Sequence, residues 1–443
     1  MAKGSARPAA TAAGEAAAPG DVIAVLRARG LVSQITESEL PAAAQAGPLT
    51  VYCGFDATAP SQQIGNLVPT MILAHFQRHG HRPILLAGGG TSMIGDPSGK
   101  SSERPLLSEE QVRANAARIP EQLGRYLSFE GPNAAILVNN ADWLNTMTLI
   151  EYLRDIGKHF SVNVMLAKES VRARLEDREQ GISYTEFSYM VLQATDYLHL
   201  FDTHGCTVQV GGHDQWGNLL AGVDLIRRAR EAHVHALTVP LITSAGGVKF
   251  GKSEGNALYL DPAMTSPYAL YQYWINIDDG DVAHYLRVFT FLPLEEIGAL
   301  EARQAADPAA REGQRRLAYE VVALIHGPET ARAVEAASRV LFGGGVEGLT
   351  PDVLPHLASA APTTRITAAQ LAAGLPLLET LVTSGLARSK GAGRTLVAQG
   401  GLYVNDRRWA DAEQPLTAGD ALFGRAILLR AGKRSYHLLL AEG

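Results

Sequence analysis

The first half of the chain alternates short apolar runs, rich in β-branched residues, with longer stretches of helical periodicity. The apolar runs are expected to be strands, and they lie at Leu49–Tyr52, Arg82–Ala87, Ala134–Val138, Cys206–Val210 and Leu237–Ile242. The helical stretches between them lie at Ile64–His79, Phe187–Leu200 and Leu219–Arg230. Apolar strands that alternate with helices form a parallel sheet covered on both faces. The sequence therefore predicts an α/β fold that binds its ligands at the C-terminal ends of the strands.

The chain has 443 residues, too many for one hydrophobic core, so several domains are expected. After Pro262 the strand-like runs give way to helical patterns, and a Gly-, Pro- and Thr-rich stretch follows Phe342. We predict a disordered Ala-rich tail at 1–20, the sheet domain at 21–260, an α-helical domain at 261–342, a linker at 343–370 and a small α+β module at 371–443.

Charge is unevenly distributed along the chain. The net charge is −6, which argues against a general nucleic-acid binder. From Leu375 to Gly443, however, nine Lys or Arg face six Asp or Glu, so this end carries +3 and the rest of the chain carries −9. A basic end on an acidic body is typical of one module that meets a polyanion, although a solvated basic surface also fits.

Two classes of protein are disfavoured by composition. No apolar run approaches the ~20 residues of a membrane helix, and the first 20 residues have no apolar core of a secretory signal.

The two cysteines, Cys53 and Cys206, have no CxxC partner, which favours a reducing cytoplasm. The thirteen histidines form no HExxH motif, so no protein-bound metal site is predicted.

The stretch from Val51 to Asn66 joins a strand to a helix through a polar loop. We expect Gly54 to end the strand and Ile64 to begin the helix. The first-turn N–H groups of a helix lack intrahelical partners, and Gly65 allows close approach to the backbone, so the loop suits a phosphate group. Taken alone, it also fits an ordinary α/β connection.

Two further glycine-rich loops carry cationic side chains. The loop at 88–104 is not a Walker loop, because Ile94 stands where glycine is needed, but its Lys100 and Arg104 suit a triphosphate. The loop at 246–256 contains Lys249, Lys252 and Ser253, which suit a developing pyrophosphate charge. Both loops also fit exposed turns with solvated charges.

Polar groups also lie on one face of a helix that should be buried and directly after a predicted strand. Tyr189, Gln193 and Asp196 share one face of the helix YTEFSYMVLQATDY, where burial is costly unless a ligand pairs with them. Asp214 follows the fourth predicted strand in GGHDQWGN, and its carboxylate suits ribose hydroxyls. Asp96, in the second loop, suits an amine or a hydroxyl group.

Six motifs in this order and spacing closely resemble those of bacterial tyrosyl-tRNA synthetases, which are class I aminoacyl-tRNA synthetases. They are YCGFDATAPS, GDPSGKSSER, GKHFSVN, GISYTEFSYMVLQATDY, GGHDQWGN and KFGKS, and the resemblance covers about residues 21–443. It implies a Rossmann-like catalytic domain at 21–260, an anticodon-recognising α-helical domain at 261–342 and a C-terminal RNA-binding module of a small-ribosomal-protein type at 371–443.

The resemblance also implies roles for residues at matching positions. Tyr52 and Asp196 would hold the substrate phenol, Asp96, Tyr189 and Gln193 its ammonium group, and Gln215 its carboxylate. The implied ATP contacts are Cys53, Gly54, Asp56, Gly65, Asn66, Gly212, Asp214 and Lys252. The implied catalytic groups around pyrophosphate are Thr58, Gln63, Lys100, Arg104, Lys249, Lys252 and Ser253.

The implied activity is a tyrosine–tRNA ligase. It uses L-tyrosine, ATP with Mg²⁺ and tRNA(Tyr), and it acts as a cytoplasmic homodimer. Three positions depart from the family pattern: Gln63 stands where histidine is usual, Thr195 where an aromatic residue is usual, and His213 where serine is usual. The alternatives are a ligase for another amino acid, tryptophan being nearest, and a weakened paralogue that acts as an RNA-binding protein.

Overall fold

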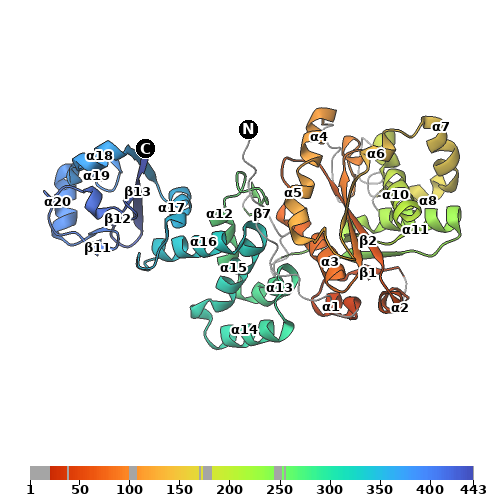
Figure 1. Ribbon diagram of the computed structural model, residues 1–443, viewed down its shortest axis with the longest axis horizontal. Coiled ribbons are helices and arrows are strands. Elements are labelled where there is room, and N and C mark those ends of the chain that lie inside the picture. The colour runs from red at the N-terminus through yellow and green to blue at the C-terminus, as the bar shows by residue number, and fades with distance from the viewer. Residues whose placement is uncertain are drawn as a thin grey trace. The chain divides into compact units, whose positions relative to one another are not determined.

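The computed structural model describes residues 20–36, 39–98, 107–168, 171–172, 182–243, 252–253 and 256–442. The chain divides into two compact units (Figure 1). The first unit comprises 1–264 and 283–299, and the second comprises 265–282 and 300–443. Within the described residues, no helix is long and apolar enough to span a membrane.

The first unit is built on a six-stranded sheet. Its strands are β1 (Gln34–Ile35), β2 (Thr50–Asp56), β3 (Arg82–Gly88), β4 (Ile136–Asn139), β5 (Cys206–Gly212) and β6 (His235–Val239). The spatial order is β1-β6-β5-β2-β3-β4, and only the short edge strand β1 is antiparallel to its neighbour. From β2 the chain goes to β3 and β4 on one side and returns to β5 on the other. The topological switch point, where such sheets bind ligands, therefore lies between β2 and β5.

Helices cover both faces of this sheet, as Figure 1 shows for α3 and α5 on one face and α10 and α11 on the other. The helices of residues 20–230 are α1 (Val22–Ala28), α2 (Leu40–Ala46), α3 (Leu67–Arg78), α4 (Glu109–Ala116), α5 (Ile119–Leu123), α6 (Ala141–Leu144), α7 (Leu149–Glu151), α8 (Val162–Leu166), α10 (Tyr184–His204) and α11 (Trp216–Arg230). Shorter helical turns are η1 (Ile64–Asn66), η2 (Thr91–Met93), η3 (Gly124–Tyr126), η4 (Tyr152–Ile156), η5 (Gly157–His159) and η6 (His213–Gln215).

The long helix α10 has clear start and stop signals. Ser183 accepts a hydrogen bond from the N–H of Glu186, which satisfies one free donor of the first turn. Gly205 ends the helix in the left-handed conformation, at φ 61°. Between these caps, Met190, Ala194 and Tyr197 bury an apolar stripe in a cluster that also contains residues of β2, β3 and β5. The helix that carries three predicted site residues is therefore fixed against the sheet.

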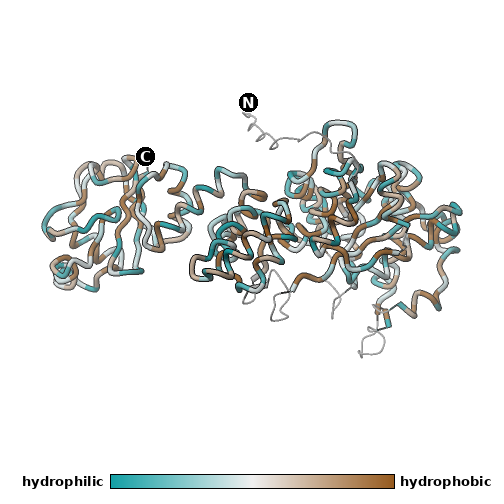
Figure 2. The backbone as a smooth tube through the Cα atoms, turned by 90° about the horizontal axis from the view of Figure 1, so that it is seen from below, coloured by the Kyte–Doolittle hydropathy of each residue, from teal (hydrophilic) through white to brown (hydrophobic). Residues whose placement is uncertain are grey.

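The second unit combines helices with a second sheet. The helices from residue 267 onward are α12 (Pro267–Ile275), α13 (Asp279–Phe289), α14 (Leu294–Ala306), α15 (Glu312–His326), α16 (Pro328–Leu341), α17 (Leu354–Ala360), α18 (Ala368–Ala373), α19 (Leu377–Thr383) and α20 (Lys390–Ala398), with short turns η7 (Pro308–Ala310), η8 (Pro351–Val353) and η9 (Ala418–Asp420). Residues of α13 and α14 are divided between the two units. The sheet contains β9 (Thr363–Thr367), β10 (Leu402–Val404), β11 (Arg407–Arg408), β12 (Ala426–Ala431) and β13 (Ser435–Glu442). Figure 2 shows hydrophobic and hydrophilic stretches alternating along the chain, as amphipathic elements around a core require.

The predicted linker at 343–370 contains regular structure. Its α17 and β9 belong to the second unit, and β9 pairs with β13 in parallel at the edge of the sheet. Leu354 and Leu357 of α17 pack in one cluster with Val340 of α16 and Leu438 of β13. The prediction of a linker is therefore wrong for these elements, because Gly, Pro and Thr mark local turns and do not reveal pairing with a strand 75 residues later. The functional division at 21–260, 261–342 and 371–443 stays a prediction.

Candidate active site

Strands β2, β3 and β5 end together at the switch point, and polar side chains follow each of them. The prediction that Gly54 ends its strand is wrong: Gly54 pairs with Leu86, and β2 continues to Asp56, which pairs with Gly88. A Cβ atom at Gly88 would lie 2.7 Å from Oδ1 of Asp56 and 2.7 Å from Oγ1 of Thr91. Glycine at this position therefore leaves room for the carboxylate.

The carboxylate of Asp56 is the meeting point of two hydroxyl groups. Thr91 Oγ1 donates to Oδ1 of Asp56 at 3.1 Å, and the Tyr189 hydroxyl donates to Oδ2 at 3.1 Å. Burial raises the pKa of Tyr189, as do the nearby charges of Asp56 and Asp96. Tyr189 therefore stays protonated and donates to Asp56.

A second polar network surrounds Asp96, which is buried. Its carboxylate accepts hydrogen bonds from the N–H of Ser98 at 2.9 Å and from Nε2 of Gln215. Asn218 lies beside the pair and donates to Oε1 of Gln215 at 3.1 Å. Burial, and then the charge of Asp56, raise the pKa of Asp96 to about 6. Two carboxyl groups so close to each other create a negative potential that suits an ammonium group.

A third network holds Asp196, in the middle of α10. Asn140 Nδ2 donates to Oδ2 of Asp196 at 2.9 Å, and Trp143 Nε1 donates to Oδ1 at 2.8 Å. Burial raises the pKa of Asp196 to about 7, although both hydrogen bonds oppose this shift. Asn140 also binds Thr91 and the N–H of Gly90, so it connects the ends of β3 and β4 to α10.

Two buried polar atoms near these networks lack a hydrogen-bond partner among the described residues. They are the Tyr52 hydroxyl and Oε1 of Gln193. Tyr52 is 1% exposed, and burial followed by the charge of Asp196 raises the pKa of its hydroxyl. An unpaired buried polar atom costs free energy, so a polar ligand or a water molecule that pairs with it would be stabilising.

The first predicted phosphate loop is partly as expected. A helical turn, η1, does begin at Ile64, but its N–H donates to the carbonyl of Leu258 at 2.9 Å. Gln63 forms an antiparallel bridge with Tyr259, and the N–H of Leu260 donates to the carbonyl of Gln62. The N–H of Ile64 is therefore already paired, because residues 258–260 bond to this loop, and phosphate binding by the loop stays a prediction.

The side chains around the loop leave an open edge. Thr58, Gln63, Gly65 and Gly54 are exposed, and an added Cβ at Gly65 would meet no atom within 4 Å. Asn66 Nδ2 donates to Oε1 of Gln62. The Nε2 group of Gln62 donates to the carbonyl of Asp56. This side of the loop is therefore accessible from solvent.

The other predicted nucleotide contacts lie in different settings. Cys53 is buried, and burial raises the pKa of its thiol to about 12. Asp214 is exposed, and a Cβ at Gly212 would lie 2.5 Å from Oδ1 of Asp214, so a larger residue there would displace this carboxylate. Lys100, Arg104 and Lys249 lie outside the described residues, and for Lys252 and Ser253 the structure gives only the backbone of the short strand β7 (Lys252–Ser253), which pairs with β8 (Asn256–Ala257).

Two of the three departures from the family pattern have clear partners. The hydroxyl of Thr195 donates to the carbonyl of Val191 at 2.7 Å, so it is satisfied within its own helix. His213 Nδ1 lies 3.1 Å from Oγ of Ser33, next to β1.

Sequence reasoning missed the residues that support the predicted ones. Asn140 and Trp143 hold Asp196, and Ser98 and Asn218 hold Asp96 and Gln215. One signal was available for Asn140, since it lies two residues after the predicted strand Ala134–Val138, whose end should lie at the ligand edge.

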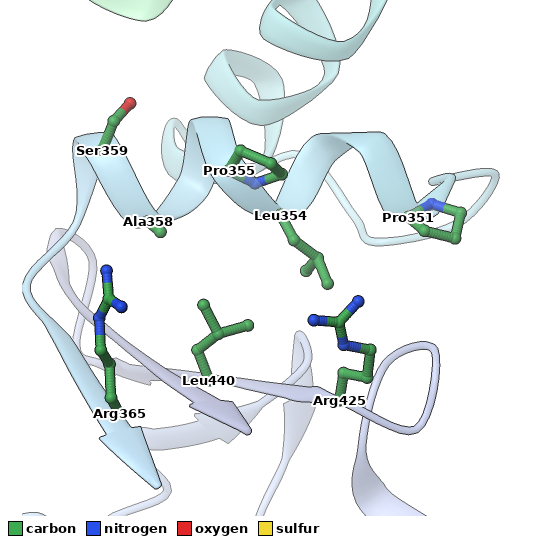
Figure 3. Close-up of a pocket in the computed structure, with 8 residues that line it drawn as sticks. All are labelled: Pro351, Leu354, Pro355, Ala358, Ser359, Arg365, Arg425 and Leu440. Atoms are coloured by element: carbon green, nitrogen blue, oxygen red, sulfur yellow. The ribbon is translucent and has the colours of Figure 1, made fainter. Parts of the chain in front are cut away.

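The pocket in Figure 3 lies elsewhere, in the second unit. It is lined by Pro351, Leu354, Pro355, Ala358, Ser359, Arg365, Arg425 and Leu440, and it contains no predicted site residue. Among the described residues, no group of three or more His, Cys, Asp or Glu side chains is arranged to hold a metal ion.

Comparison with known proteins decides the family. A model of the class I tRNA synthetases (W and Y) matches residues 44–343, which is more than half of the chain. The chain belongs to the class I tRNA synthetases of the tryptophan and tyrosine type. A second model, of the tyrosine–tRNA ligase SYY-like C-terminal domain, matches residues 355–439 of this synthetase.

Relatives of this class I synthetase agree. A tyrosine–tRNA ligase of Opitutus terrae is 51% identical over 93% of this chain and 97% of its own length. One of Mycobacterium tuberculosis is 51% identical over 94% and 98%. A C-terminally truncated mitochondrial tyrosyl-tRNA synthetase of Aspergillus nidulans superposes with a TM-score of 0.65 at 33% identity, over 73% of this chain and 94% of that one. The predicted resemblance and fold class are confirmed.

Proposed function

We propose that this synthetase is a tyrosine–tRNA ligase, which activates L-tyrosine with ATP to tyrosyl-adenylate and pyrophosphate and then transfers the tyrosyl group to the 3′ end of tRNA(Tyr). Relatives that share about 50% of its sequence carry that name. The observation that carries the choice of amino acid is the buried Tyr52 hydroxyl beside the buried carboxylate of Asp196. The alternative of a paralogue that acts only as an RNA-binding protein has no support from these relatives.

Recognition of the phenol follows from this pair. The substrate hydroxyl would donate to Asp196, and Tyr52 would donate to the substrate oxygen. Both protein groups would then be satisfied. Phenylalanine would leave the Tyr52 hydroxyl unpaired in a buried site, which is why the site would reject it.

Recognition of the amino-acid backbone would use the other two networks. Asp96, Tyr189 and the unpaired Oε1 of Gln193 offer acceptors to the ammonium group. Gln215 is held by Asn218 at Oε1 and by Asp96 at Nε2, so the second hydrogen of Nε2 would donate to the substrate carboxylate. With these assignments the substrate would lie between β2, the loop after β3 and the middle of α10.

ATP would lie along the open edge of the η1 loop. The exposed Thr58 and Gln63 face solvent there, and Lys100, Arg104, Lys249, Lys252 and Ser253 are proposed to surround the pyrophosphate. Mg²⁺ would arrive with ATP as the substrate complex and spread the developing charge. The protein's own part is to place the carboxylate in line with the α-phosphorus and to neutralise the leaving group.

Tyrosine-dependent exchange between pyrophosphate and ATP tests the function directly. The expected result is exchange with tyrosine and none above background with phenylalanine or tryptophan. Exchange with tryptophan in place of tyrosine would overturn the choice of amino acid, and no exchange with any amino acid would overturn the enzyme assignment.

Gln63 gives a specific prediction for the activation step. An amide can donate an N–H to a phosphate oxygen, but it cannot carry the positive charge of an imidazolium. Gln63→His is therefore expected to raise the rate of adenylate formation and to leave the affinity for tyrosine unchanged, as measured by single-turnover kinetics. A lower rate would mean that Gln63 is matched to this site.

We also propose that the synthetase is a homodimer. Residues 149–166 expose an apolar patch, which we call the α7–α8 patch, made of Leu149, Ile150, Leu153, Val162, Val164 and Leu166. Leu149 and Ile150 are 69% and 66% exposed. Several large apolar side chains exposed within one short segment are typical of a protein–protein interface, and a second copy of the chain is the partner expected from the family resemblance.

Sedimentation velocity tests the homodimer. The wild type is expected to sediment as a species with twice the chain mass of 47.2 kDa. Ile150→Asp is expected to shift it toward a monomer, because a charge in an apolar interface must be desolvated. Leu241→Asp is the matched control, since Leu241 is 56% exposed and lies outside the α7–α8 patch. A wild-type monomer would contradict the proposal, as would an equal shift in both variants.

The remaining assignments extend the same function. We propose that residues 261–342 recognise the anticodon and that 371–443 bind RNA with their basic side chains. The two free cysteines, Cys53 and Cys206, are consistent with a reducing cytoplasm as the site of action.

A further inference from the structure

The ring of His199 stacks on the indole of Trp143. The ring centroids are 4.2 Å apart, and the planes differ by 16°. Trp143 belongs to the four-residue helix α6, whereas His199 lies in α10, between the caps of a 21-residue helix. The stack therefore joins a short element to a rigid one.

The other contact of Trp143 is with Asp196. Its Nε1 donates to Oδ1 of the carboxylate at 2.8 Å. His199 follows Asp196 by three residues in α10, so both side chains lie on the same side of the helix. Helix α10 thus carries both the Asp196 carboxylate and the His199 ring, and Trp143 contacts both of them.

The charge state of His199 favours flat stacking. Burial lowers its pKa, and His204 lowers it further, while Asp202 opposes the shift. The ring is therefore neutral at neutral pH. A neutral imidazole stacks on indole as other aromatic pairs do.

We propose that His199 is a positioning residue for tyrosine recognition, which keeps the Trp143 indole in the plane where its N–H fixes the Asp196 carboxylate. The proposal rests on the proposed function, because it needs Asp196 to accept the substrate phenol. Without the stack the indole can tilt, and Asp196 then loses one of its two observed donors. A buried carboxylate with fewer donors is a poorer acceptor for the substrate, since it protonates more readily.

The experiment compares His199→Ala with His199→Phe in the tyrosine-dependent exchange assay. His199→Ala is expected to raise the KM for tyrosine roughly three- to tenfold, the size of a lost aromatic contact, and to leave the KM for ATP unchanged. Discrimination against phenylalanine is expected to fall by the same factor, because phenylalanine makes no bond to Asp196. His199→Phe keeps a flat ring and is expected to restore both values.

The matched control is His204→Ala, an exposed histidine of the same helix that makes no stack in the described structure. His204→Ala is expected to behave as the wild type, because burial is the larger cause of the lowered pKa of His199 and is unchanged in this variant. The proposal is overturned if His199→Ala leaves the KM for tyrosine unchanged, if it raises the KM for both substrates equally, or if His199→Phe is no better than alanine. If His199→Ala does not fold, His199→Phe and His199→Gln are compared instead. A wild-type KM for tyrosine in His199→Phe with a raised KM in His199→Gln supports the proposal. Equal KM values in these two variants overturn the proposal. Pyrophosphate exchange by the wild type tests the proposed function by itself. That function stands even if His199 has no role in tyrosine recognition.

Discussion

Replacing Asp196 by alanine is expected to lower kcat/KM for tyrosine in pyrophosphate exchange by about two orders of magnitude, the effect of losing one hydrogen bond to a charged group in a buried site. The change removes the only proposed ionic acceptor for the substrate phenol. It also leaves the donors of Asn140 and Trp143 without their present partner. The KM for ATP is expected to stay within about twofold, because Asp196 is not among the proposed nucleotide contacts.

Tyr52→Phe provides the comparison for this variant. It removes a buried hydroxyl that has no partner in the described structure, so the free energy of unfolding without substrate is expected to rise by about 1 kcal/mol. The same change is expected to weaken tyrosine binding about tenfold, because one neutral hydrogen bond to the substrate is lost. Opposite signs for stability and affinity would identify Tyr52 as a ligand-binding group. A loss of stability in Tyr52→Phe, or equal use of tyrosine by the wild type and Asp196→Ala, would contradict the proposed phenol site.

Tyrosine affinity is expected to fall with pH below neutrality. The pKa of Asp96 is raised to about 6 and that of Asp196 to about 7, so both carboxyl groups take up protons in this range in the ligand-free protein. The ammonium group of tyrosine binds the ionised form of Asp96, and the phenol is accepted best by the ionised form of Asp196. The Kd is therefore expected to rise by up to about tenfold per pH unit between pH 7 and 6, and more steeply below pH 6, where both groups take up protons.

Calorimetric titration with tyrosine in the absence of ATP tests this expectation. A bound ammonium group lowers the pKa of Asp96, so binding near pH 6 is expected to release protons, and the observed heat should depend on the ionisation enthalpy of the buffer. Near pH 8 both groups are already ionised, and that dependence should vanish. A Kd that is constant from pH 5 to 8, with no proton release, would show that neither carboxyl group titrates in the ligand-free site.

The local elements of the fold were predictable because their signals are local. The apolar runs at 82–87 and 206–210 became β3 and β5, and the periodic stretch at 187–200 lies inside α10. Errors arose where a distant segment completed the structure. Gly54 signals a strand end, yet β2 continues because β3 pairs with it on one side up to Asp56. A glycine has no side chain to pack, but its backbone groups bond as well as those of any residue.

The candidate site divides in the same way. The motifs placed Tyr52, Asp96, Asp196 and Gln215 in one site, and the structure assigns each of them, except Tyr52, to a hydrogen-bonded network. The supporting residues were not predictable. Trp143 lies 53 positions before Asp196, in a helix of four residues, and nothing in the spacing indicates that the two meet.

The sequence by itself determined the family, the alternation of strands and helices, and which residue types could bind an amino acid and a nucleotide. Only the tertiary structure decided which of these groups are satisfied and which are left for a ligand. The physical reason is that burial and hydrogen bonding depend on residues distant in the chain. The hydroxyl groups of Tyr52 and Tyr189 look alike in the sequence, but the one bonds to no described residue and the other donates to Asp56.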